Sequence, residues 1–149
     1  MKSRFFQAQC SCKFTKHNIL QECMQAARMA LQTLGPSHTE RAYEDCMVNY
    51  FYKKRVPYLR QKPFYEHFED QVIPVGVCDI EVDHSIVLEL KANVKEISED
   101  HKNQLRRYLR AANNSNKLYV GAVILFSKEG QLHIWCSHYT DNQIFGTQC

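Results

Sequence analysis

Apolar residues recur at helical spacing in two neighbouring stretches near the start of the chain. The first stretch runs from Thr15, which we expect to cap a helix, to Leu34, and Gly35-Pro36 should end it. The second follows the segment Ser37-His-Thr-Glu40, which has the form of a capping box, and ends near Lys53-Lys54-Arg55. The pattern predicts two helices that each bury one face.

A different pattern begins after the second helix. Pro57 and Pro63 flank a strand-like stretch that Phe64 to Phe68 can continue. Residues 75–82 and 86–91 alternate in the manner of strands, and Asp83-His-Ser separates them as a turn, which predicts a hairpin.

The second half of the chain predicts a crossover. Ser98 opens a third helix that runs to about Ala112, a loop follows, and residues 118–126 form a nearly unbroken apolar run. Such a run is typical of a central strand covered on both faces. The strand–helix–strand unit should be a right-handed crossover between parallel strands. With a further strand over 132–136, the chain is predicted to be an α/β sandwich around a mixed sheet.

The length and composition of the chain agree with one globular domain. The chain has 149 residues, 44% of them hydrophobic and 23% charged, which is enough for a core and excludes a disordered tail. We expect a single domain over 1–149, with 1–14 as an arm and 127–149 as a C-terminal strand extension. No apolar run is long enough to cross a membrane. The five glycines form no phosphate-binding loop, which disfavours a nucleotide-binding regulatory protein.

The cysteines predict a reduced protein. Their number, seven, is odd, and the chain opens with no signal peptide, so we expect an intracellular protein of the cytoplasm or nucleus. Cys10, Cys12, Cys136 and Cys149 invite an iron–sulfur or zinc interpretation, but without a C-x-x-C pair isolated thiols are favoured.

The most informative conflict lies between Asp79 and Lys91. Burying a carboxylate is costly unless a cation or hydrogen bonds compensate, yet Asp79, Glu89 and Lys91 stand among Val, Ile and Leu. Strand geometry places Glu89 and Lys91 on one face. The two acids, with the Leu90 carbonyl as a third oxygen, suit Mg²⁺ or Mn²⁺, which prefer oxygen ligands. Lys91 could orient or deprotonate a water, or stabilise a pentavalent phosphate.

These residues carry a resemblance. Asp79, nine intervening residues and Glu89-Leu-Lys91 resemble the motif of the PD-(D/E)xK nuclease superfamily, with Cys78 where the motif has proline. The segment Leu34 to Glu44 is similar to the signature of its GxxExxY group, with Ser37 in place of the second glycine. Gln104-Leu-Arg-Arg-Tyr108 resembles a motif of RecB-like exonucleases.

The resemblance implies a restriction-endonuclease-like fold with an αβββαβ core, and a metal-dependent nuclease. Asp79, Glu89 and Lys91 would be the catalytic triad, and Glu40 would add a carboxylate that assists or holds a second ion. Gln104 and Tyr108, one helical turn apart, would face the site.

Two basic clusters are candidates for phosphate contact, although solvated faces explain most charge runs. They are formed by Lys102, Arg106, Arg107 and Arg110, and by Lys53, Lys54 and Arg55.

Each site residue also has a structural interpretation. Glu40 could be only a capping-box acid, Gln104 a surface residue and Tyr108 a core aromatic. For Tyr43 we favour packing. For His101, which could approach the site, we favour a place at the helix start without function.

Two functions therefore stand. The first is a Mg²⁺- or Mn²⁺-dependent deoxyribonuclease that cuts phosphodiester bonds by metal-activated water, with nucleic acid as its partner, as a homodimer or within a repair or replication assembly. The alternative is a catalytically weak or inactive module on the same fold that binds nucleic acid or protein.

Overall fold

The computed structural model describes residues 16–113, 119–140 and 143–148. The helices and strands follow one another as α2 (His17–Leu34), α3 (Glu40–Lys53), β1 (Tyr58–Phe68), β2 (Gln71–Val82), β3 (Ile86–Ala92), α4 (Glu99–Asn113), β4 (Val120–Phe126), β5 (Leu132–Thr140) and β6 (Gln143–Gln148). The predicted cap Thr15, the arm over 1–14 and most of the loop after Asn113 lie outside the described residues.

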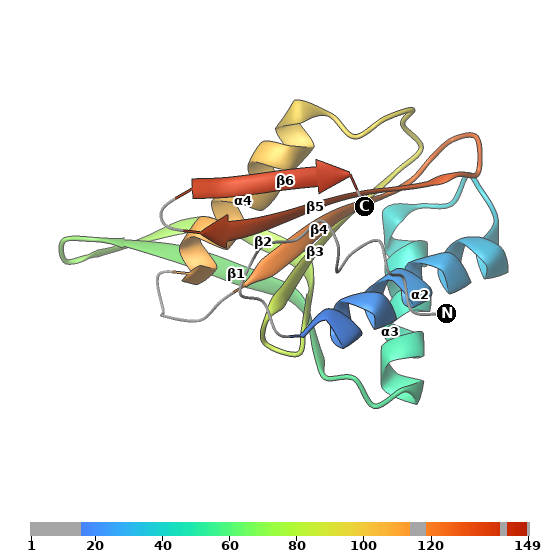
Figure 1. The fold of residues 1–149 in the computed structure, drawn as a ribbon, viewed down its shortest axis with the longest axis horizontal. Coiled ribbons are helices and arrows are strands. Elements are labelled where there is room, and N and C mark those ends of the chain that lie inside the picture. Colours follow the sequence, from blue (N-terminus) through green and yellow to red (C-terminus); the bar gives the residue numbers. More distant parts are fainter. Residues whose placement is uncertain (1–15, 114–118, 141–142, 149) are drawn as a thin grey trace.

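The strands form a single mixed sheet in chain order, β1-β2-β3-β4-β5-β6. β3 and β4 are parallel and are joined through α4, as the crossover prediction requires, while the other neighbours are antiparallel. α2 and α3 lie on one side of the sheet and α4 on the other (Figure 1). The α/β prediction, with a restriction-endonuclease-like mixed sheet flanked by helices, is confirmed.

The core consists of two layers because helices cover both faces of the sheet. β4 is buried along its whole length, as its apolar run predicted. On the α3 side, the Tyr43 ring stacks on Phe126 with 4.0 Å between ring centroids, and its hydroxyl donates to the Gly35 carbonyl at 2.6 Å. Tyr43 therefore packs the core and holds the loop between α2 and α3, as we favoured.

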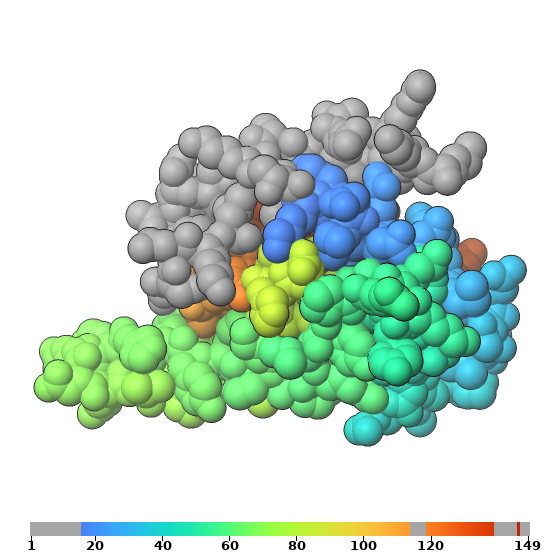
Figure 2. Space-filling view, turned by 90° about the horizontal axis from the view of Figure 1, so that it is seen from below, coloured from blue at the N-terminus to red at the C-terminus, as the bar shows by residue number. Residues whose placement is uncertain are grey.

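The β1–β2 hairpin was not predicted: the sequence indicated a strand that Phe64 to Phe68 can continue and a second strand from residue 75, but not that the two pair. Its strands continue to Phe68 and resume at Gln71, so the hairpin projects from the side of the molecule (green in Figure 2). Phe68, Val72 and Ile73 are exposed there.

None of the described helices is both long enough and apolar enough to cross a membrane.

Candidate active site

The site begins where β2 and β3 separate. Their ladder pairs Val82 with Ile86 and ends at Ile80 opposite Leu88. Beyond that point the two strands are joined by hydrogen bonds from backbone N–H groups to two side-chain carboxylates. The Asp79 backbone N–H donates to Glu89 Oε1 at 3.1 Å, and the Leu90 N–H donates to Asp79 Oδ2 at 2.7 Å. The carboxylates of Asp79 and Glu89 thus fill the opening between two strands.

Lys91 lies beside these acids, as the period of the strand predicted. Its Nζ is 3.9 Å from Glu89 Oε2, and its side chain is 19% exposed, compared with 3% for Glu89. One cation therefore faces a carboxylate that is almost fully withdrawn from solvent. Desolvation makes such an interaction stronger than a surface ion pair.

The electrostatics of the site favour the capture of a positive charge. Burial, followed by repulsion from Asp79, raises the pKa of Glu89 to about 8, while Lys91 acts in the opposite direction. Burial also raises the pKa of Asp79, and repulsion from Glu44 and Glu40 adds to this, although the Leu90 N–H and the Gln61 amide oppose it. Lys91 alone does not neutralise this group of acids. The donor set therefore fits a hard divalent cation, which would relieve the repulsion.

Glu40 is placed differently from the capping-box prediction. The residue that caps α3 is Thr39, whose Oγ1 accepts the Ala42 N–H at 3.1 Å, whereas Ser37 has a positive φ of 69°. Glu40 is then the first helical residue and not the third, so it cannot be the capping-box acid. The capping-box prediction is wrong. The Glu40 side chain is exposed, and its charge raises the pKa of both Asp79 and Glu89.

Gln104 and Tyr108 form a pair on α4. Gln104 Nε2 donates to the Tyr108 hydroxyl at 3.0 Å, and that hydroxyl donates to the Val77 carbonyl on β2 at 3.0 Å. The Tyr108 ring is buried against Phe64, so its packing interpretation holds. Burial and then the charge of Glu89 raise the pKa of Tyr108, which places its phenol within electrostatic reach of the site.

The basic residues of α4 divide into two groups. Lys102 Nζ and the Arg106 guanidinium lie over the Trp135 ring, at 5.5 and 5.0 Å from its centroid, and Arg106 also pairs with Glu99 at 2.7 Å. Arg107 and Arg110 are exposed. Internal contacts thus occupy the first two, while the second two are available to a ligand.

The other predicted cluster follows α3. Lys53, Lys54 and Arg55 are all exposed, and Lys54 Nζ lies 5.7 Å from the centroid of the Tyr50 ring. Their contact with nucleic acid stays a prediction, as does the use of the Leu90 carbonyl as a ligand.

His101 has the structural role that we favoured. Its Nδ1 accepts the Ser98 N–H at 3.2 Å, and Ser98 Oγ accepts the His101 N–H at 3.1 Å. This reciprocal pair begins α4 in the way a capping box does. Burial and then the charge of Lys91 lower the pKa of His101, while Glu40 acts in the opposite direction. The ring therefore also senses the charges of the site.

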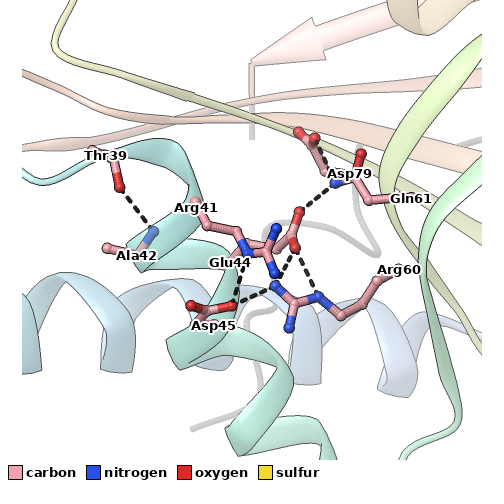
Figure 3. A network of polar contacts seen from close by, with 8 residues as sticks. All are labelled: Thr39, Arg41, Ala42, Glu44, Asp45, Arg60, Gln61 and Asp79. Atoms are coloured by element: carbon pink, nitrogen blue, oxygen red, sulfur yellow. Dashed lines mark hydrogen bonds and ion pairs between the residues drawn. The ribbon is translucent and has the colours of Figure 1, made fainter.

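The structure adds three residues that the sequence did not single out. Gln61 Nε2 donates to Glu44 Oε1 at 2.7 Å and to Asp79 Oδ1 at 3.4 Å, and Arg60 Nε donates to Glu44 Oε2 at 2.8 Å (Figure 3). The sequence contained one indication of these residues. Glu44 follows Tyr43 on the apolar side of its helix, and a carboxylate in that position needs partners.

The cysteine predictions have a mixed outcome. Cys23 and Cys78 are buried free thiols whose pKa burial raises, so both are small core residues. Cys136 is disulfide-bonded, so the expectation of an isolated thiol is wrong there. Cys10, Cys12 and Cys149 lie outside the described residues. Within the described ranges, no three His, Cys, Asp or Glu side chains are grouped to hold a metal ion.

One comparison with known proteins gives a clear result. The model of the PD-(D/E)XK nuclease superfamily matches residues 17–134, which span α2 to the beginning of β5 and include all the proposed site residues. No curated protein and no solved structure matches the chain. Because the family model covers most of the chain, and because Asp79, Glu89 and Lys91 meet where two strands separate, the chain belongs to the PD-(D/E)XK nuclease superfamily.

Proposed function

We propose that this protein is a nuclease that hydrolyses phosphodiester bonds of DNA with the help of Mg²⁺ or Mn²⁺. The observation that carries the proposal is the meeting of two desolvated carboxylates, Asp79 and Glu89, with the ammonium of Lys91 beside them. Acids that only stabilised the fold would be expected to have cations or hydrogen-bond donors matching their charge. Here burial, and then repulsion from Asp79, outweigh the compensation by Lys91, and together they raise the pKa of Glu89 to about 8.

Asp79 and Glu89 would hold the cation, with the Leu90 carbonyl as a further oxygen ligand, and Glu40 would assist or hold a second ion. The described residues alone offer no group of three acids or histidines for an ion, so water and a phosphate oxygen would complete the shell. When bound, the cation would neutralise charge on the phosphate and lower the pKa of a coordinated water.

The remaining chemistry belongs to the chain itself. In hydrolysis a water oxygen forms a bond to phosphorus while the ester bond to the leaving oxygen breaks, the water loses a proton, and the leaving oxygen gains one. Lys91 Nζ lies beside Glu89 and could orient the water or stabilise the charge that develops on phosphorus. Gln104 and Tyr108 fix the position of α4 over the site, and Arg107 and Arg110 are exposed on that helix to bind the phosphate backbone.

The test is a cleavage assay with matched variants. Single- and double-stranded DNA, and RNA of the same sequence, are incubated with Mg²⁺, Mn²⁺ or EDTA. We expect DNA cleavage that requires the metal and falls by about 100-fold or more in Lys91→Ala. Lys95→Ala, which removes an exposed lysine four residues further on, should cut as wild type does.

Two further outcomes separate the alternatives. Cleavage of RNA only would overturn the choice of substrate while leaving the site intact. Binding of nucleic acid without cleavage under any metal would support an inactive binding module on the same fold. Thermal unfolding adds a readout that is independent of turnover, because Mn²⁺ should raise the melting temperature of wild type but not of Asp79→Asn.

A further inference from the structure

Gln61 has a backbone conformation that a strand does not require. Its φ is +51°, in the left-handed region that non-glycine residues adopt at a cost. The ladder between β1 and β2 pairs Arg60 with Ile80 and Lys62 with Cys78, and it omits Gln61 and Asp79 between them. The irregularity in β1 thus occurs opposite the first acid of the site.

This conformation brings the Gln61 amide between two carboxylates. Figure 3 shows the side chain between Glu44 of α3 and Asp79 of β2. Its Nε2 is 2.7 Å from Glu44 Oε1 and 3.4 Å from Asp79 Oδ1. Because both neighbours accept hydrogen bonds, the NH₂ group must be the end of the amide that faces them.

Glu44 in turn is an immobilised anchor. It is 2% exposed, and Arg60 pairs with it through Nε at 2.8 Å and through Nη2, while the same guanidinium also pairs with Asp45. The Arg60 charge compensates the buried carboxylate of Glu44. The direction of the Gln61 amide is therefore set by a charged pair that does not itself touch Asp79.

Asp79 consequently has a donor on each carboxylate oxygen. The Leu90 N–H occupies one position on Oδ2 at 2.7 Å, and the Gln61 amide occupies one on Oδ1. These two bonds define the plane of the carboxylate, and each oxygen keeps a lone pair for a further ligand. They also place an amide between two acids that would otherwise face each other.

We propose that Gln61 is a positioning residue that orients Asp79 for metal binding, with the Glu44–Arg60 pair as its anchor. This inference rests on the proposed function. Groups that orient a metal-binding carboxylate typically alter metal affinity or activity by about 10–100-fold when they are removed. The opposing interpretation is that Gln61 only completes a bend in β1.

Two variants separate the amide from the bend. Gln61→Gly keeps the bend, because glycine accepts a positive φ readily, but it removes the amide. Gln61→Met keeps most of the side-chain volume and removes both donors. The control is Glu69→Gly, which also places glycine at a residue of positive φ (53°), here an exposed one in the β1–β2 turn, away from the site.

The measurements are Mn²⁺ binding by titration calorimetry, kcat and KM for DNA, and the melting temperature, all on the full chain. We expect Gln61→Gly to melt no lower than wild type while its Mn²⁺ affinity and kcat fall by about 10-fold or more, with little change in KM. Gln61→Met should show the same losses, and Glu69→Gly should show none.

The inference is overturned if wild type binds Mn²⁺ and cuts DNA while both Gln61 variants do so equally well. It is also overturned if Gln61→Gly retains wild-type Mn²⁺ affinity and only Gln61→Met is impaired, because the side-chain volume would then be the cause. If wild type itself neither binds Mn²⁺ nor cuts DNA, the proposed function fails, and this inference fails with it for a distinguishable reason.

Discussion

The ring of Tyr108 lies against the backbone of Gly76, in the space where any other residue would have its Cβ. A Cβ built at Gly76 would be 2.8 Å from Tyr108 Cε1 and 2.9 Å from its hydroxyl oxygen, and φ of Gly76 is +150°. The Tyr108 hydroxyl donates to the backbone carbonyl of Val77, the residue after Gly76, at 3.0 Å. α4 thus packs on β2 at Gly76, three residues before Asp79. A substitution at Gly76 should therefore change the geometry of the site.

We expect Gly76→Ala to lower the free energy of unfolding by about 1–3 kcal/mol, because the added methyl group overlaps the ring and the backbone conformation is strained. Activity should fall further than stability explains, since the displaced Tyr108 loses its contact with β2. Urea unfolding and a cleavage assay check this. Gly130→Ala is the control, because its φ of +79° carries strain but its nearest neighbour is at 3.6 Å. Equal losses in the two variants would mean that the Tyr108 contact is unimportant.

The raised pKa of Glu89 predicts how stability depends on pH in the absence of metal. The carboxyl titrates near 8 in the folded protein and near 4.5 in its ordinary state, so the folded state holds the extra proton between these values. Stability should therefore be highest below pH 4.5, as far as this group is concerned, and decrease as pH rises towards 8. Asp79 shifts in the same direction, so the two acids should titrate as a pair.

Urea unfolding in EDTA at pH 5.5 and 8.5 measures this effect, which should be on the order of a few kcal/mol. Glu89→Gln should be more stable than wild type at pH 8.5, because its amide oxygen can still accept the Asp79 N–H without a buried charge. Mn²⁺ should restore the stability of wild type at that pH. A wild-type protein with the same stability at both pH values would show that Glu89 is ionised at little cost.

Some basic residues of α4 are exposed and others are held by internal contacts, so substitutions in the two groups should have different effects. Arg107→Gln combined with Arg110→Gln should weaken DNA binding and reduce the slope of log affinity against log salt by roughly 2, without a change in melting temperature. Arg106→Gln should instead lower stability by about 0.5–1 kcal/mol, because Arg106 stacks on Trp135 and pairs with Glu99. Fluorescence anisotropy over a salt series, together with thermal unfolding, distinguishes them. A salt slope that changes only in Arg106→Gln would reverse the assignment.

The sequence was most informative where neighbouring residues alone determined the local structure, as where charged residues interrupt an apolar strand. Glu89 and Lys91 alternate within an apolar strand, so their common face followed from strand geometry alone. β4 was evident because a fully buried strand needs apolar residues on both faces. Both inferences depend on a few neighbouring residues and not on the partner strand.

Features that depend on distant partners were not predictable. The role of Gln61 arises from its register against Asp79 and from Glu44 on another helix, and no local pattern contains that information. The pairing of β1 with β2 as a hairpin was missed because Glu69, which has a φ of 53° at its turn, is neither glycine nor asparagine. β6 pairs with β5 at its Gly146, where a Cβ would overlap the ring of Trp135, and this close fit is visible only in three dimensions.

The start of α3 shows how a local motif can be misassigned. Ser37-His-Thr-Glu40 has the spacing of a capping box, but Thr39 supplies the cap two residues later, which leaves Glu40 without a capping role. Spacing alone could not choose between Ser37 and Thr39, since both are good caps. The choice depends on the left-handed conformation of Ser37 in the loop held by Tyr43.

That assignment separates stability from activity in two adjacent residues. Thr39→Ala should lower the free energy of unfolding by about 1 kcal/mol through loss of the cap, with a small effect on catalysis. Glu40→Gln should leave the melting temperature nearly unchanged, because the side chain is exposed, while metal-dependent cleavage falls, because a carboxylate that acts on both Asp79 and Glu89 is neutralised. Thermal unfolding and cleavage rates on both variants make the comparison. If Glu40→Gln lowered the melting temperature and spared cleavage, Glu40 would be a structural residue and the site would contain only the acids of β2 and β3.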